Sequence, residues 1–265
     1  MVDFAGAGLP LSDDGFARVL DILGVDAAEV WTVLSVETKG FGYLPDRRPL
    51  ILFERHIFSK QTGGAFDTTN PDISSPKPGG YAGGAEEYER LAAAIALNRH
   101  AALNSTSWGI GQVMGFNSNL AGYDPVEAMV DAMVHDEDAQ LACMANFVKA
   151  EGLHQPLQNH NWARFARGYN GTDFAKNQYD TRLASYYQKF AAGPLPDLQV
   201  RQAQALLTFL GIDPNGVDGI AGKRTRSAVA QFREQNGLGD SDEIDDDLIA
   251  ALRAQVEVAA AAVTT

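Results

Sequence analysis

The chain has 265 residues, 45% of them hydrophobic and 21% charged, which is ordinary for a globular protein and long enough for one large core plus a small second domain. Its formal net charge of −13 argues against partners that need a basic face, such as nucleic acid or an anionic membrane surface. The single cysteine, Cys143, cannot form an internal disulfide, so it is predicted to be a small core residue in a fold held by packing.

The second of two predicted N-terminal helices carries a carboxylate where its apolar face continues. After a helix over residues 12–24, residues 26–40 predict another, with Asp26 as its N-terminal cap and Gly40 in the left-handed conformation past its end. The apolar face consists of Val30, Val33 and Leu34. The next position on that face is Glu37, and a carboxylate held against apolar neighbours has a raised pKa and keeps a proton near neutral pH. Glu37 therefore has the property of a general acid, and the alternative is a side chain that turns to solvent at the last helical turn.

A second carboxylate, Glu54, stands at the exit of a predicted strand. Residues 50–53 form a short apolar run bounded by Pro49, which is typical of a buried strand. The preceding loop, residues 40–49, is rich in Gly and Pro and can turn the strand back across the end of the helix that carries Glu37. A carboxylate on a helix end that faces another on a strand end is the arrangement that glycoside hydrolysis uses. The alternative for Glu54 is an ion pair with Arg47, Arg48 or Arg55.

The chain after Glu54 is predicted to be mostly helical. Residues 41–84, which include the strand, are rich in Gly, Pro, Asp and Thr and form a loop and small-sheet region that is long enough to be functional. Asp124 is predicted to cap a helix that has Pro125 at its first helical position. The predicted helices span residues 86–103, 125–149, 162–169 and 177–190.

A Gly-Pro-Leu-Pro segment at residues 193–196 breaks the helical pattern and marks the predicted domain boundary. The acidic run at residues 240–247 lacks the alternating oxygen ligands and the glycine of a calcium loop, so it is predicted to be a solvated helix start. The predicted parts are a first domain over residues 1–192, a linker over 193–197, a second domain of three short helices over 198–254 and a tail over 255–265.

Three segments together resemble a known family. They are ETKGFGYLPDRRPLILFERHIF from Glu37, SWGIGQVMGFN from Ser107 and ARGYNG from Ala166. Their order and spacing resemble the N-acetylmuramidase family of phage endolysins and related bacterial cell-wall hydrolases, within the wider lysozyme and lytic-transglycosylase superfamily. The resemblance covers most of residues 12–192. It implies a mainly α, lysozyme-like catalytic domain of the α+β kind, with a small β region.

The resemblance also implies site residues. It assigns Glu37 as general acid, Glu54 as second catalytic carboxylate, and Gln112 with the pair Tyr169 and Asn170 as cleft residues that contact the glycan. Gln112 offers a donor and an acceptor together, which suits a hydroxyl or an N-acetyl group.

Four aromatic side chains have two interpretations each. Trp108 is predicted to stack on a sugar face, with a place in the core as the alternative. Tyr169 holds Glu37 or substrate through its hydroxyl, or it is a half-buried core residue. Tyr43 and Phe41 follow Glu37 closely, and they line the same cleft or belong to the core.

The C-terminal region resembles a peptidoglycan-binding module of three helices. Its distinctive signature, Asp-Gly-x-x-Gly-x-x-Thr, runs from Asp218 to Thr225, a glycine-rich turn that feeds a helix start with Thr225 as its cap. The other matching residues are Val200, Gln204, Leu207, Leu210, Gly211, Ala228, Val229 and Phe232. The resemblance implies bacterial peptidoglycan as the partner, since a wall anchor raises the effective concentration of the enzyme at an insoluble polymer. The alternative is a packing domain without a ligand.

Other readings of the site differ in the residues they need. A lytic transglycosylase shares Glu37 but needs one catalytic carboxylate, so Glu54 favours hydrolysis. Asp46 has the spacing from Glu37 seen in phage-T4-like lysozymes but lacks their following Thr, so it ranks behind Glu54 and is expected to pair with Arg47 or Arg48. The five histidines lack zinc-ligand spacing, which argues against a zinc amidase or peptidase. The presence of both glutamates argues against a non-catalytic wall-binding protein.

The resulting prediction is a monomer that hydrolyses the β-1,4 bond between N-acetylmuramic acid and N-acetylglucosamine without metal or cofactor. Glu37 protonates the leaving oxygen, and Glu54 activates water or acts as nucleophile or electrostatic partner. The N-terminus has no basic region followed by an apolar run, so no signal peptide is expected. A phage lysis enzyme released through a holin is the favoured setting, and a secreted antibacterial effector is the alternative.

Overall fold

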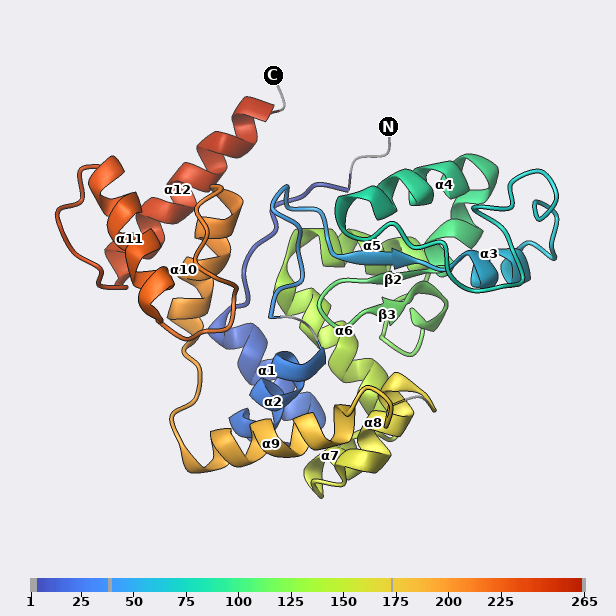
Figure 1. Ribbon diagram of the computed structural model, residues 1–265, viewed down its shortest axis with the longest axis horizontal. Helices are drawn as coiled ribbons and strands as arrows, with labels where there is room; N and C mark the ends of the chain where they lie inside the picture. The colour runs from blue at the N-terminus through green and yellow to red at the C-terminus, as the bar shows by residue number, and fades with distance from the viewer. Residues whose placement is uncertain (1–3, 38–39, 173, 264–265) are drawn as a thin grey trace. The chain divides into compact units, whose positions relative to one another are not determined.

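The computed structural model describes residues 4–37, 40–172 and 174–263, without the side chains of Glu37, Ala262 and Val263. The described chain is mainly helical with one small sheet, as predicted (Figure 1). It forms two compact units. None of its helices combines the length with the apolar character that crossing a membrane requires. The first unit consists of the described residues of 1–9, 21–24 and 42–155, and the second of those of 10–20, 25–41 and 156–265.

The first unit contains an antiparallel sheet in the order β1-β2-β3. Its strands are β1 (Ile51–Phe53), β2 (Thr106–Trp108) and β3 (Val113–Met114). The register pairs Leu52 with Ser107, and Ser107 with Met114. The strand predicted over residues 50–53 is confirmed apart from its first residue, and it lies at an edge of the sheet. All of β2 is buried, so neither face of this central strand is open to solvent.

Two helices frame β1. The short α3 (Arg55–Gln61) follows it directly, and α4 (Glu87–Asn104) comes after a long loop and the single turn η1 (Gly84–Glu86). The prediction of an uninterrupted helix over residues 86–103 is wrong at Asn98, whose backbone is extended (φ −159°, ψ 102°). The Asn98 side chain accepts a hydrogen bond from the Ala101 amide at 2.9 Å, so it caps the second half of α4.

The long helix predicted over residues 125–149 is two helices, α5 (Val126–His135) and α6 (Glu137–Ala150). Pro125 precedes α5 in an extended conformation, so the helix begins one residue later than predicted. Asp136 breaks the pair because its side chain accepts from the Ala139 amide at 2.6 Å and caps α6. Leu9 fills the gap: its amide donates to the His135 carbonyl at 3.0 Å and its carbonyl accepts from the Glu137 amide at 2.9 Å.

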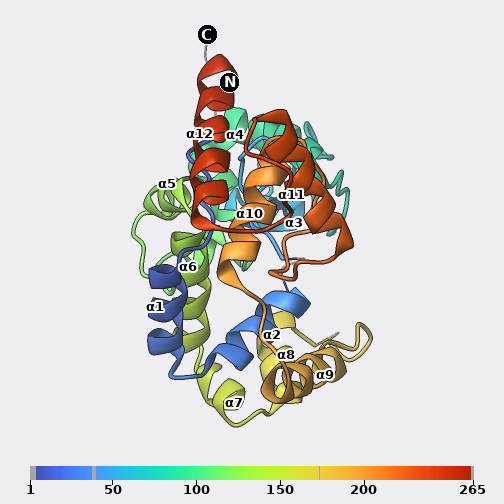
Figure 2. The same ribbon diagram turned by 90° about the vertical axis from the view of Figure 1, so that its left-hand side faces the viewer.

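The second unit contains the helix that ends in Glu37. This helix, α2 (Ala27–Glu37), packs against α9, which also packs against α8 (Figure 2). The Arg182 guanidinium of α9 donates to the Val36 carbonyl at the end of α2, at 3.3 Å. The remaining helices here are α1 (Asp13–Leu23), which contributes to both units, α7 (His154–Gln158), α8 (Trp162–Asn170) and α9 (Tyr179–Ala192).

The three helices predicted near the C-terminus are present. They are α10 (Leu198–Phe209), α11 (Lys223–Gln235) and α12 (Asp246–Val263), so the predicted tail continues the last helix through Val263. Gly222, not Thr225, is the N-cap residue of α11. Thr225 is buried and accepts from the Gln204 side chain at 3.2 Å, so it joins α10 to α11. The core shared by these helices is Ala203, Leu206, Leu207, Ala228, Val229, Phe232, Leu248, Ile249, Leu252 and Val256.

Helix α10 also packs on earlier parts of the second unit. The Arg201 guanidinium donates to the Gly40 carbonyl at 2.6 Å, and the Phe41 and Phe209 ring centroids lie 5.3 Å apart. Gly40 has φ +90°, and a Cβ there would collide with the Val217 carbonyl oxygen. The module is therefore held by packing as well as by the chain segment at residues 193–197.

Candidate active site

The carboxylate of Glu54 lies at the end of β1, where the sequence predicts it. The Glu54 backbone donates to the Ser105 carbonyl at 2.8 Å and occupies the N-cap position of α3. Its side chain makes no capping hydrogen bond. The two carboxylate oxygens instead accept from the Tyr81 hydroxyl, at 3.1 Å for Oε1 and 2.9 Å for Oε2. A charged side chain is thus held by a rigid strand end and by one neutral donor.

The neighbours of Glu54 are not the arginines offered as its alternative partners. Arg48 pairs with Asp46 at 2.6 Å, and Arg55 donates to the carbonyls of Lys77 and Pro78 at 3.0 and 3.2 Å. His56 brings Nδ1 to 3.1 Å from Oε2 of Glu54 but without the alignment of a hydrogen bond.

Tyr81 is a residue that the sequence did not single out. It belongs to the loop before η1, it is about half exposed, and the loop has no periodic pattern that would mark it. Burial, and then the hydrogen bond to Glu54, raise the pKa of its phenol. The hydroxyl therefore stays protonated and remains a donor to the carboxylate.

Glu87 is a second residue missed, and it ties the Tyr81 loop to β1. It is completely buried at the start of α4. One carboxylate oxygen accepts from the amides of Ala82 and Gly83 at 2.6 and 3.0 Å, and the other accepts from the Phe53 amide at 3.1 Å. Burial opposes the ionisation of Glu87, but these amides and Arg90 at 2.7 Å outweigh it and lower its pKa. Glu87 thereby anchors the residues next to both Glu54 and Tyr81.

Gln112 lies in the turn between β2 and β3. Its backbone is in the left-handed region (φ +47°) and its side chain is exposed. The carboxamide oxygen accepts from the Ser107 hydroxyl at 2.8 Å, and the carboxamide nitrogen donates to the carbonyls of Gly109 and Leu50 at 2.8 and 3.2 Å. Gln112 is accessible and oriented by the first unit's own sheet, and its contact with a glycan stays a prediction.

Trp108 and Tyr43 were predicted as substrate-binding residues, and the structure corrects both. Trp108 is 0% exposed, and its indole N–H donates to the Leu103 carbonyl at 3.2 Å. Tyr43 is 3% exposed, and its hydroxyl donates to the Met133 carbonyl at 2.9 Å. A ring that is buried on both faces cannot stack on a sugar, so these two residues belong to the core.

The other predicted site residues lie in the second unit. Glu37 is the last residue of α2, and its side chain lies outside the described part of the structure. Tyr169 and Asn170 are the last two residues of α8 and are half-buried. The Tyr169 ring stacks on Phe165 with centroids 5.7 Å apart and an interplanar angle of 8°. Within the second unit, α2 and α8 both contact α9.

Asp46, which the sequence ranks behind Glu54 as the second carboxylate, is paired with Arg48. Asp46 is about half exposed and is engaged by Arg48 through both its guanidinium and its backbone amide, as the alternative for that residue expected.

Among the described residues, no group of three or more His, Cys, Asp and Glu side chains is arranged to hold a metal ion.

The structure has a mainly helical fold with a small antiparallel sheet, followed by a three-helix module, which is the class of fold that the sequence predicts. Comparison with known proteins agrees with this class. Residues 26–191 match the family described as N-acetylmuramidase, and residues 196–252 match a putative peptidoglycan binding domain. The crystal structure of the endolysin of Burkholderia phage AP3 shares 43% sequence identity and a TM-score of 0.65, over 68% of this chain and 70% of that one. No curated protein matches the chain.

The chain belongs to the N-acetylmuramidase family. It is a muramidase-type glycoside hydrolase that acts on the bacterial cell wall, and peptidoglycan is its substrate and partner. The resemblance stated from the sequence motifs is therefore confirmed for both parts of the chain.

Proposed function

We propose that the enzyme hydrolyses the β-1,4 bond between N-acetylmuramic acid and N-acetylglucosamine, with Glu37 as proton donor and Glu54 as the second carboxylate. The observation that carries the proposal is the environment of the Glu54 carboxylate. Its side chain is only 16% exposed, yet it is neither neutralised by an arginine nor used as a helix cap, and it is oriented by Tyr81. A carboxylate held in this way suits a base, a nucleophile or an electrostatic partner.

The environment of α2 supports the role of Glu37. Val30, Val33 and Leu34, which precede it on the same helical face, are each at most 2% exposed. A carboxylate that continues such a face loses hydration, and this favours its protonated form. Glu37 then delivers that proton to the leaving oxygen. The separation of the two carboxylates decides the stereochemistry: about 5–5.5 Å gives retention and roughly 6.5–9.5 Å gives inversion.

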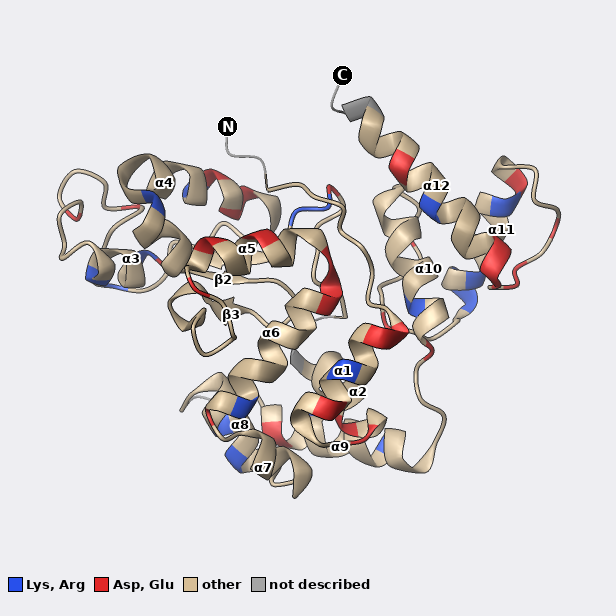
Figure 3. Ribbon diagram, turned by 180° about the vertical axis from the view of Figure 1, so that it is seen from behind, with Lys and Arg blue, Asp and Glu red and all other residues tan. Residues whose placement is uncertain are grey.

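Gln112, Tyr169 and Asn170 are proposed to contact the glycan. Gln112 is bonded to the backbone just before β1, the strand that leads to Glu54. Tyr169 and Asn170 end α8, which packs on the same helix, α9, as the helix that ends in Glu37. Residues 198–254 serve as the wall-binding module and residues 1–192 as the catalytic part. Acidic residues are spread over both parts, including the loop that joins α11 to α12 (Figure 3), which disfavours nucleic acid and anionic membranes as partners of the proposed monomer.

The AP3 phage endolysin favours lysis at the end of a phage infection as the biological setting, with release to the wall through a holin. A secreted antibacterial effector is the second candidate, because the same chemistry serves both.

The bond cleaved is tested by digesting purified peptidoglycan with the full-length protein, reducing the new ends with borohydride and identifying them by mass spectrometry. The proposal expects N-acetylmuramitol at the new ends. N-acetylglucosaminitol would show cleavage of the other glycosidic bond, and intact glycan strands would show a binding protein without this activity.

A further inference from the structure

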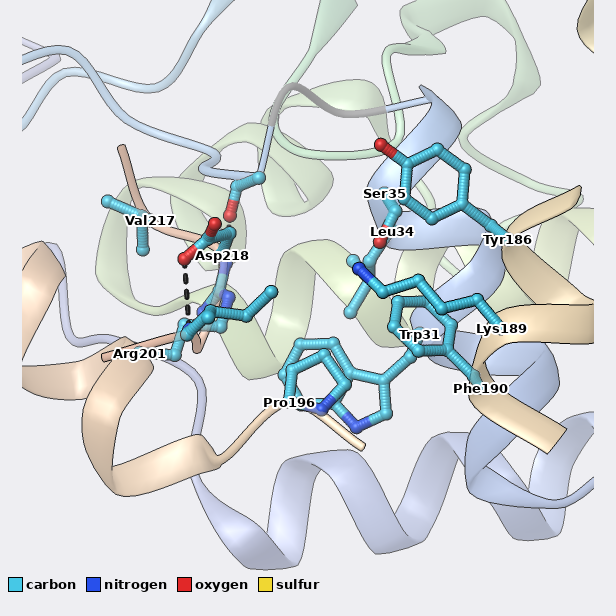
Figure 4. Close-up of a pocket in the computed structure, with 12 residues that line it drawn as sticks. Trp31, Leu34, Ser35, Tyr186, Lys189, Phe190, Pro196, Arg201, Val217 and Asp218 are labelled. Atoms are coloured by element: carbon cyan, nitrogen blue, oxygen red, sulfur yellow. Dashed lines mark hydrogen bonds between the residues drawn. The ribbon is translucent and has the colours of Figure 1, made fainter. Parts of the chain in front are cut away.

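A cavity of about 290 Å³ lies in the second unit, between α2, α9 and the binding module (Figure 4). Of the two residues assigned to catalysis, Glu54 is the one with a described side chain, and it does not line the cavity. The lining includes Trp31, Leu34, Gly40, Lys189, Phe190 and Asp218. The volume is just below the usual range for small-molecule sites, roughly 300–1,000 Å³, so it fits the end of a chain better than a disaccharide.

The walls of the cavity are mainly apolar. Trp31 and Phe190 are almost completely buried at 3% and 4% exposure, and Leu34, Pro196 and Val217 extend the same surface. Such a lining suits small aliphatic groups, whose transfer from water it favours. Ser35, Tyr186 and Asp218 add polar groups to this lining.

In the described part of the chain, two cations line the cavity, and Arg201 is engaged by the Gly40 carbonyl, so Lys189 is the one considered for a ligand. Lys189 extends from α9 into the space between Trp31 and Asp218 (Figure 4). Within the described residues its ammonium has no carboxylate in ion-pair distance and lies over the rings of Tyr186 and Phe190, 5.9 and 5.4 Å from their centroids. Asp218 is engaged elsewhere, since its Oδ1 accepts from the Gln204 side chain and the Ile220 amide, both at 2.9 Å. The Lys189 ammonium can therefore pair with an anionic group that enters the cavity.

We propose that this cavity binds the carboxylate-bearing end of a peptidoglycan stem peptide. Lys189 pairs with the terminal carboxylate, and the apolar wall receives the methyl group of the terminal alanine. The proposal rests on peptidoglycan as the substrate and deepens the proposed function by naming the part of the polymer that is recognised. Because Gly40 lines the cavity three residues after Glu37, peptide binding would also contact the segment that follows the proposed proton donor.

The test is calorimetric titration of the full-length protein with the free tetrapeptide L-Ala-D-Glu-meso-diaminopimelate-D-Ala and with its C-terminal amide. We expect the tetrapeptide to bind the wild type. The affinity of the amide should be lower by about tenfold or more, because the amide lacks the charge-assisted pair. Lys189→Met should lower the affinity for the tetrapeptide by the same factor and leave the affinity for the amide unchanged. Lys149→Met, an exposed lysine of α6, is the matched control and should bind like the wild type.

Equal affinity of the tetrapeptide for the wild type and Lys189→Met would overturn the proposal, and so would the absence of binding to the wild type. Displacement of the peptide by chitotetraose would assign the cavity to the glycan instead. Binding is read without cleavage, so a failure here leaves the two-glutamate mechanism untouched, and an inactive enzyme leaves this test intact.

Discussion

The Tyr81 hydroxyl donates to both carboxylate oxygens of Glu54, at 2.9 and 3.1 Å, and this contact joins the loop before η1 to the end of β1. A neutral donor orients a carboxylate without the full positive charge of an ion pair. The carboxylate is therefore fixed in position while its charge remains available to a substrate. The loop that carries Tyr81 is itself anchored by Glu87 and Arg55, so the orientation of Glu54 depends on several further hydrogen bonds.

Tyr81→Phe should lower kcat by about tenfold or more with little change in KM, because it removes a hydrogen bond to a charged group worth about 1.5–3 kcal/mol. The measurement is steady-state release of reducing ends from purified wall. Tyr179→Phe, which keeps its ring contact with Arg182 on α9, is the control and should behave like the wild type. A raised KM with unchanged kcat would show that Tyr81 contacts the substrate rather than positioning Glu54.

Glu37→Gln and Glu54→Gln should each reduce turnover at least about a hundredfold, since positioned acids and bases contribute about 10²–10⁴. Asp46→Asn should retain wild-type activity, because Asp46 is exposed and occupied by Arg48. Turbidity loss of purified wall measures all three, with circular dichroism to show that each variant is folded. Loss of activity in Asp46→Asn with retention in Glu54→Gln would reverse the assignment of the second carboxylate.

The position of Glu54 could be predicted because an apolar run of strand length ends in a charged residue, and a strand end fixes that residue whatever its partners are. The same reasoning fails for Trp108 and Tyr43. An aromatic side chain suits a sugar and a core equally, and only the packing of β2 between its neighbours shows that Trp108 is enclosed. Tyr81 was missed for the opposite reason, because loop residues have no period and its role exists only through a contact 27 residues away.

Glu87→Gln should destabilise the protein by about 3 kcal/mol at pH 7, because it leaves Arg90 without its charged partner and weakens three backbone hydrogen bonds. The expected fall in melting temperature is roughly 6–12 °C. Glu89→Gln, exposed on the same helix, is the control and should melt like the wild type. An unchanged melting temperature for Glu87→Gln would mean that this network does not hold the loop.

The same residue predicts a pH dependence. The pKa of Glu87 is lowered in the folded protein from an ordinary value of 4.5, so its ionised form stabilises the fold above that value. This contribution is lost as the pH falls through the lower, folded-state pKa. The melting temperature of the wild type should therefore fall more steeply between pH 5 and pH 3 than that of Glu87→Gln. Parallel curves for the two proteins would contradict the lowered pKa.

Gly40→Ala should loosen the module, because an alanine at φ +90° is strained and its Cβ would collide with the Val217 carbonyl. Gly211→Ala is the matched control: Gly211 has φ +74° but open space around its Cβ position, so it carries the strain without the collision. We expect Gly40→Ala to cost about 1–3 kcal/mol more than Gly211→Ala, seen as a lower melting temperature. Equal effects would mean that α10 and its following turn do not pack on Gly40.

Packing of this kind lies beyond what sequence patterns show. The gap at the Asp136 helix break is bridged by Leu9, which comes from 127 residues earlier. The contact of Arg201 with Gly40 likewise joins residues 161 positions apart. Local propensity predicts the helices on either side of these points, but the bridging by Leu9 and the docking of α10 are tertiary effects.

The central claim is that Glu54 makes the enzyme a hydrolase. It is tested most directly by digesting purified peptidoglycan in H₂¹⁸O and measuring the masses of the new glycan ends by mass spectrometry. The account predicts reducing N-acetylmuramic acid ends that carry one ¹⁸O atom, with Glu54→Gln giving almost none. Unlabelled anhydro-muramic ends, formed equally by the wild type and Glu54→Gln, would contradict it, because the sugar's own hydroxyl would then have replaced water.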